Sequence, residues 1–166
     1  VANYGESANG VSLLIGNGDG SFQAPLTLGS GPNPASVIFG DFNGDKNADI
    51  LVANQGDGTI TFLTGNGNGT FKDPTGDFSS VGSVPGSLIA RDYNGDGKLD
   101  FSVATAGDNR VYTFFGNGNG TFGTPIGTDV GLSPFSVATG SYKNKSGTVL
   151  PFLVSGNAGG NDISVS

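Results

Sequence analysis

The sequence predicts an all-β fold built from repeated units of four antiparallel strands, and three observations predict it. A glycine-rich turn recurs three times, apolar residues form short runs without a helical period, and Gly, Asn and Asp cluster between those runs. Repeats of about 50 residues with four strands each are typical of β-propeller blades. We therefore expect blades of the β-propeller type.

The glycine-rich turn sets the repeat length. Its first copy runs from Gly16 to Phe22, and it returns from Gly65 to Phe71 and from Gly116 to Phe122, so the copies begin 49 and 51 residues apart. Its Asn and Gly residues tolerate the positive φ angles that tight hairpins require. The Phe that closes each copy is expected to re-enter the sheet and join the core of the blade.

Each complete unit is expected to hold four strands. The clearest unit has strand-like runs at Ser36–Gly40, Asp49–Ala53 and Thr59–Thr64, followed by a short segment after Phe71. The alternation of these runs with turn residues is typical of short antiparallel strands rather than of helices.

The repeats divide the chain into a single repeat domain, residues 1–166. Its expected parts are a partial blade at 1–34, complete blades at 35–85 and 86–133, and a partial blade at 134–166. The length of the chain corresponds to about three repeats of roughly 50 residues, whereas closed propellers have about four to eight blades. We therefore expect a ring that is incomplete in one chain.

Composition excludes several classes of function. The chain has no Cys and no His, so disulfides, thiol chemistry and imidazole ligands or bases are absent. A net charge of −7 argues against nucleic acid as a partner, because proteins bind its phosphates with clusters of Lys and Arg. No apolar run approaches the roughly 20 residues that span a bilayer, so no membrane insertion is expected. Hard cations are the natural electrostatic partners of such a chain.

Two nine-residue segments, 41–49 and 92–100, place oxygen-bearing side chains at alternating positions. Calcium takes six to eight oxygen ligands, and the seventh position of such a loop supplies a backbone carbonyl. We therefore expect two Ca²⁺ ions per chain. The candidate ligands are Asp41, Asn43, Asp45, Asn47 and Asp49 in the first loop, and Asp92, Asn94, Asp96, Lys98 and Asp100 in the second.

Two further features of these loops shape the prediction. The same Asp and Asn residues can form Asx turns without any metal, and this alternative stays open. Position 12 is Val52 or Val103 rather than Glu, so the loops are not EF-hands. The third copy, Ser141 to Val149, carries Lys143 and Lys145 at positions 3 and 5, and these cations are expected to exclude calcium.

These loops, together with the segments 11–22 and 40–45, resemble the FG-GAP or VCBS repeats of integrin α-subunit propellers and secreted bacterial proteins. The resemblance covers essentially the whole chain. It implies a propeller whose Asp-rich loops bind calcium, an extracellular or cell-surface location, and a role in adhesion or in carbohydrate or protein binding. It implies no particular ligand, because the scaffold hosts many functions.

Two functions of different classes follow. The first is an extracellular, calcium-stabilised module that binds a glycan or a protein, with Tyr4, Tyr112 and Tyr142 as candidates for sugar stacking or for sheet packing. The alternative is a structural subunit that self-associates through open β-edges into a ring or filament, or a chain that is part of a longer one. An enzyme such as a glycosidase would need a pair of carboxylates as acid and base, but six of the fourteen acidic residues already lie in the two loops. No enzyme is therefore expected.

Overall fold

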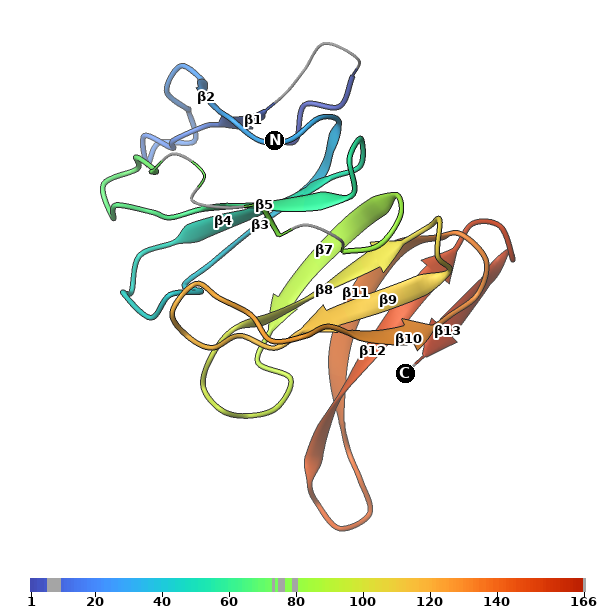
Figure 1. Cartoon of the computed structure of the whole chain (residues 1–166). Coiled ribbons are helices and arrows are strands. Elements are labelled where there is room, and N and C mark those ends of the chain that lie inside the picture. The colour runs from blue at the N-terminus through green and yellow to red at the C-terminus, as the bar shows by residue number, and fades with distance from the viewer. Residues whose placement is uncertain (6–9, 73, 75–76, 79–80, 166) are drawn as a thin grey trace.

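The computed structural model describes residues 1–5, 10–72, 74, 77–78 and 81–165, and every regular element in these ranges is a β-strand. The strands form four antiparallel sheets that follow one another in an open arc (Figure 1). The described residues contain no helix that could cross a membrane. The expected all-β, propeller-like fold with an incomplete ring is thereby confirmed.

Each sheet is built from strands that are consecutive in the sequence. The first holds β1 (Val11–Leu13) and β2 (Leu26–Leu28), and the second holds β3 (Pro34–Gly40), β4 (Asp49–Asn54), β5 (Thr59–Leu63) and β6 (Asp77–Phe78). The third holds β7 (Pro85–Arg91), β8 (Asp100–Thr105), β9 (Arg110–Phe114) and β10 (Ile126–Asp129), and the fourth holds β11 (Pro134–Lys143), β12 (Val149–Asn157) and β13 (Asp162–Val165).

The second and third sheets are the two complete blades. In each, four strands lie in sequence order, and every neighbouring pair is antiparallel. The strands β3, β4 and β5 return as β7, β8 and β9 after 51 residues. The four strands expected in the clearest unit are thus present, with β6 as the short segment after Phe71.

The second strand of each complete blade is buried on both faces. In β4, Leu51 and Ala53 belong to a cluster shared with the third sheet, whereas Ile50 and Val52 belong to a cluster shared with the first sheet. Because successive side chains of a strand point to opposite faces, an unbroken apolar run fills both interfaces. This explains why the apolar residues 50–53 follow one another without polar residues between them.

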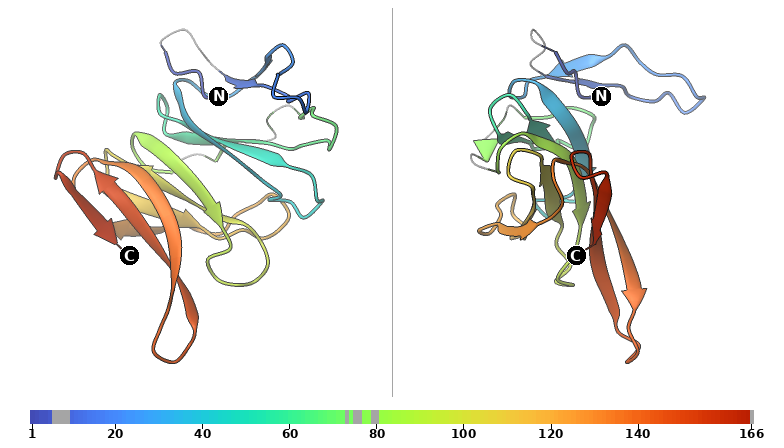
Figure 2. Two further views of the ribbon diagram at one scale, coloured as in Figure 1. Left: turned by 180° about the vertical axis from the view of Figure 1, so that it is seen from behind. Right: turned by 90° about the vertical axis from the view of Figure 1, so that its right-hand side faces the viewer.

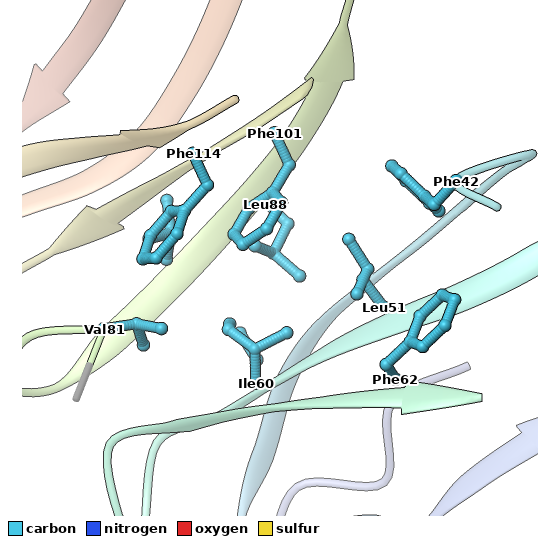
Figure 3. Packing of buried hydrophobic residues seen from close by; sticks show 10 residues of the cluster. Phe42, Leu51, Ile60, Phe62, Val81, Leu88, Phe101 and Phe114 are labelled. Atoms are coloured by element: carbon cyan, nitrogen blue, oxygen red, sulfur yellow. The ribbon is translucent and has the colours of Figure 1, made fainter. Parts of the chain in front are cut away.

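The largest core lies between the second and third sheets (Figure 3). Phe101 stacks on Phe114 with ring centroids 4.5 Å apart and meets the edge of Phe122 at 4.8 Å. From the facing sheet, Leu51 and Ile60 project into the same cluster, and both are fully buried. Aromatic pairs at these distances add to the free energy gained from burying apolar area.

The glycine-rich turns adopt the expected hairpin. Gly18 and Gly20 have φ angles of 85° and 92°, and the glycines at the same positions of the other two copies are also positive. Phe122 packs into the main core and Phe71 is half-buried, as predicted. Phe22 is 62% exposed, which corrects the prediction for the first copy. Its hairpin lies at one end of the arc, where no further sheet covers it (Figure 1).

The third copy of the Asp-rich loop has a different register from the one predicted. Pro134 pairs with Asn157 as Pro34 pairs with Asn54, yet Gly140 pairs with Phe152 rather than with Val149. The hairpin between β11 and β12 is therefore three residues longer than its counterparts. It projects well beyond the neighbouring blades (Figure 2).

This register changes the reason for expecting no third site. Phe152, an apolar residue, takes the place that Asp49 and Asp100 occupy in the complete blades. Lys143 ends β11, and Lys145 lies in the turn that follows. The absence of calcium from this hairpin stays a prediction, now because residues 141–151 contain two lysines and no Asp or Glu at all.

Candidate metal centre

Both Asp-rich loops leave the end of the first strand of a complete blade. The first connects β3 to β4 and the second connects β7 to β8. The pairs Gly40 with Asp49 and Arg91 with Asp100 close the base of each loop. The ladder therefore fixes both ends of each loop and leaves only its tip to be organised by local hydrogen bonds.

The carboxylate at position 1 organises the tip. In Asp41, Oδ1 accepts hydrogen bonds from the backbone N–H of Gly44 at 2.7 Å and of Asp45 at 3.1 Å. Its Oδ2 accepts from the N–H of Lys46 at 2.9 Å. Asp92 makes the same three bonds at 2.6, 3.2 and 2.9 Å. One carboxylate thus gathers three backbone donors, which a side chain without oxygen could not do.

Positions 3 and 5 continue the pattern as Asx turns. Oδ1 of Asn43 accepts from the N–H of Asp45 at 2.9 Å, and Oδ1 of Asp45 accepts from the N–H of Asn47 at 2.8 Å. Asn94 and Asp96 make the equivalent bonds in the second loop at 2.9 and 3.0 Å. The Asx turns that the sequence left open as an alternative are therefore present.

These turns favour the ionised form of the carboxylate at position 5. The backbone hydrogen bond from Asn47 is the main cause that lowers the pKa of Asp45, and the bond from Lys98 does the same for the pKa of Asp96. Both side chains stay charged and face solvent well below neutral pH. They are thus available as anionic oxygen donors.

The carboxylate at position 9 has a different environment. Asp49 is fully buried, and its Oδ2 accepts from the N–H of Phe42 at 3.0 Å while its Oδ1 accepts from the N–H of Gly65 at 2.9 Å. Asp100 bridges the corresponding Tyr93 and Gly116 at 2.8 Å each. Each buried aspartate therefore ties its loop to the start of the glycine-rich hairpin of the same blade.

Position 7 differs between the two loops. Asn47 lies against the glycine-rich hairpin, where its Oδ1 occupies the space that a side chain on Gly67 would need. Lys98 places its Nζ 3.7 Å from Oδ2 of Asp96. An ammonium group beside a candidate ligand competes with a cation for the same oxygen, so the second loop is electrostatically the weaker candidate.

The first loop also contacts the next blade, which sequence reasoning missed. The N–H of Gly120 donates to the carbonyl of Phe42 at 3.0 Å, and the Phe42 and Phe122 rings lie 6.0 Å apart. Phe42 itself is buried in the main core. An aromatic residue at position 2, as in both complete blades, was the available signal that the loop is anchored inward.

Chemically, the donor set of each loop suits a hard cation. Every candidate side-chain donor at positions 1, 3, 5 and 9 is a carboxylate or amide oxygen, which calcium prefers over nitrogen or sulfur. Within the described ranges, however, no three acidic, His or Cys side chains form a metal-binding group. Each loop tip offers two carboxylates, of which one is half-buried and one exposed, together with one amide and a backbone carbonyl, while the buried aspartate ties the loop to its hairpin.

The backbone hydrogen bonds to Asp49 and Asp100 do not offset the energetic cost of burying a charged carboxylate. Burial is the main cause that raises the pKa of both carboxyls, against the backbone bonds that lower it. The folded state then holds these protons more tightly than the unfolded state. Stability from the two groups is thus fully present below the ordinary value of 3.8 and is lost as pH rises through the raised pKa.

We expect this loss of stability with rising pH to be measurable when wild type is compared with Asp100→Asn in calcium-free buffer. The stability of wild type relative to the variant should fall as pH rises from below 3.8. Asp96→Asn is the matched control, because the lowered pKa of Asp96 predicts a difference that rises over the same range. Urea unfolding at a series of pH values measures both slopes, and equal slopes would contradict the assignment.

An open arc of four-stranded sheets, with an Asp-rich loop at the end of the first strand of each complete blade, defines a propeller-like repeat protein. The model of the FG-GAP-like repeat matches residues 1–52, 41–103 and 92–144. The chain therefore belongs to the FG-GAP-like repeat family. Comparison with curated proteins finds no match.

Among solved structures, the chain is similar to a lectin of Agrocybe aegerita described as recognising non-reducing terminal N-acetylglucosamine. The two share 18% identity with a TM-score of 0.53, over 95% of this chain and 46% of the lectin chain. The chain thus spans about half the length of that structure. A likeness at this identity supports the β-rich repeat fold and leaves function to be argued from the site.

Proposed function

We propose that this chain is a calcium-stabilised, non-enzymatic module that binds a carbohydrate or protein ligand outside the cell. The observation that supports it best is the pair of matching loops, each with two carboxylates, one of them exposed, and an amide oxygen held in one tight turn. Membership of the FG-GAP-like repeat family and the fold shared with a lectin support the binding role.

The residues proposed to hold the ion are those of the loop tips. Asp41, Asn43 and Asp45 would bind it in the first loop, with the carbonyl of Asn47, and the equivalent residues would do so in the second. Without a cation, the two carboxylates of a tip repel each other. A bound divalent cation attracts both carboxylates, so the net interaction in the tip becomes attractive and favours the folded loop.

An extracellular setting suits sites of this composition. Calcium affinity rises with the number of charged ligands, and extracellular modules bind calcium in the range of about 10⁻⁴–10⁻³ M. Each loop tip offers only two carboxylates, and the tips face solvent. Self-association through open β-edges, the alternative function, stays a prediction.

Calcium is expected to raise the melting temperature of the protein. Binding to the folded state alone stabilises by about 2.7 kcal/mol per site at a hundredfold excess over Kd, or roughly 5–10 °C per site for a chain of this size. Differential scanning calorimetry in calcium and in chelator measures the shift, and titration calorimetry should count two ions per chain. Magnesium should act much more weakly.

Two variants make this test specific. Asp45→Ala should remove one of the two ions, because it deletes an anionic donor of the first tip. Asp57→Ala is the matched control: its carboxylate also forms an Asx turn, with Thr59 at 3.2 Å, but outside both loops. It should leave the calcium-induced shift unchanged. A melting temperature that ignores both calcium and chelator would refute the metal proposal.

A further inference from the structure

A groove lies at the opposite end of the first strands from the Asp-rich loops. The strands β3, β7 and β11 contact one another in that order, and the second and third residues of each line the groove. It encloses about 250 Å³ and is lined by Ser36, Gln55, Gly86, Ser87, Phe135 and Ser136, among others. Only the tertiary structure brings these residues together, because about fifty residues separate each strand from the next.

Two exposed aromatic rings border the groove. Phe135 is 73% exposed and Tyr4 is 67% exposed, and both line an adjoining hollow of about 390 Å³ together with Gln55. The hydroxyl of Tyr4 donates to Oε1 of Gln55 at 2.8 Å, which holds the tyrosine against the groove. Large rings left in water within one concavity are typical of a binding surface rather than of a core.

The polar groups of the groove are neutral. Oγ of Ser36 accepts from the N–H of Leu88 at 3.1 Å, so its own hydrogen is left as a donor. In the described part of the chain, the hydroxyls of Ser87 and Ser136 have no hydrogen bond of their own. Among the described residues, no Asp, Glu, Lys or Arg lines the groove, although the chain carries a net charge of −7. The surface therefore complements an uncharged, hydroxyl-rich ligand.

We propose that this groove binds the terminal pyranose of a neutral oligosaccharide. A pyranose has an apolar C–H face that can lie on Phe135 or Tyr4 and hydroxyls that can bond to the serines and to Gln55. This inference rests on the proposed function and names its ligand and its site. At about 3.3 Å per residue, a strand of this length places the groove roughly 20 Å from the loops. Calcium would thus stabilise the blades without touching the sugar.

The test uses immobilised neutral oligosaccharides ending in glucose, galactose, mannose or N-acetylglucosamine, followed by titration calorimetry with the best binder. Phe135→Ala and Tyr4→Ala are each expected to weaken binding about tenfold, because each removes a stacking ring. Gly86→Leu should abolish it. The backbone at Gly86 suits any residue, and a Cβ there meets only Phe135 and Ala104 oxygens at 3.5 and 3.8 Å, so the longer side chain fills the groove.

Phe22→Ala is the matched control, since Phe22 is similarly exposed but lies in the glycine-rich hairpin of the first sheet. It should leave affinity unchanged. Calorimetric melting of every variant checks that it is folded. Absence of binding to all neutral glycans, or binding that is unaffected by Phe135→Ala and Gly86→Leu, would overturn the proposal. Asp45→Ala separates the two proposals: a smaller calcium-induced shift in melting temperature, together with retained sugar binding at low temperature, supports both.

Discussion

Replacing Asp100 by alanine is expected to lower the free energy of unfolding by about 2–6 kcal/mol, even in chelator. The substitution leaves two backbone donors, the N–H groups of Tyr93 and Gly116, without their acceptor. Each buried donor that loses its partner costs about 1–3 kcal/mol. Chelator removes any contribution from metal, so the loss reports the structural bridge alone. Urea unfolding followed by circular dichroism measures it.

Two comparisons test this result. Asp100→Asn retains one acceptor oxygen and should lose less than Asp100→Ala. Asp57→Ala removes an exposed Asx turn and should cost about 1 kcal/mol or less, because water replaces the lost partner. If Asp100→Ala cost no more than Asp57→Ala, the buried bridge would have no special role in stability.

Replacing Phe101 by alanine is expected to cost about 3–5 kcal/mol. Phe101 is fully buried, stacks on Phe114 at 4.5 Å with an interplanar angle of 8°, and meets the edge of Phe122 at 4.8 Å. Its removal opens a cavity between the two complete blades, and truncation of buried aromatic residues costs about this much. The same unfolding measurement applies.

The size of the side chain is the variable to control. Phe101→Leu preserves more of the volume and should cost less than Phe101→Ala. Phe135→Ala removes the same ring from an exposed position and should change stability by no more than about 0.5 kcal/mol. A Phe101→Ala loss as small as that of Phe135→Ala would mean that the blades do not depend on this interface.

The repeat and its hairpins were predictable from sequence because their causes are local. The glycines of the turn need positive φ, and their spacing alone indicates where each hairpin falls. The strands that precede each hairpin follow from short apolar runs of strand length. The turns at Asp41 and Asp92 were equally predictable, because their hydrogen bonds reach no further than five residues along the chain.

The roles of Asp49 and Asp100 were not predictable in this way. Sequence spacing placed both among the metal ligands, which stays a prediction, and the structure adds that each is buried beneath its loop with two backbone donors. One donor of each pair, Gly65 or Gly116, lies 16 residues away. Sequence spacing does not reveal which backbone groups a fold will bring to a buried carboxylate, because that depends on the packing of hairpin on loop.

Composition and periodicity thus determined the strands, the hairpins and the Asp-rich turns of this protein, since each depends on residues that are neighbours in the chain. Only the tertiary structure decided the register of the long hairpin, where Phe152 rather than Val149 faces Gly140. It alone also assembled the groove around Phe135 from the beginnings of three strands. Both depend on contacts across sheets, whose energies arise only when distant segments pack together.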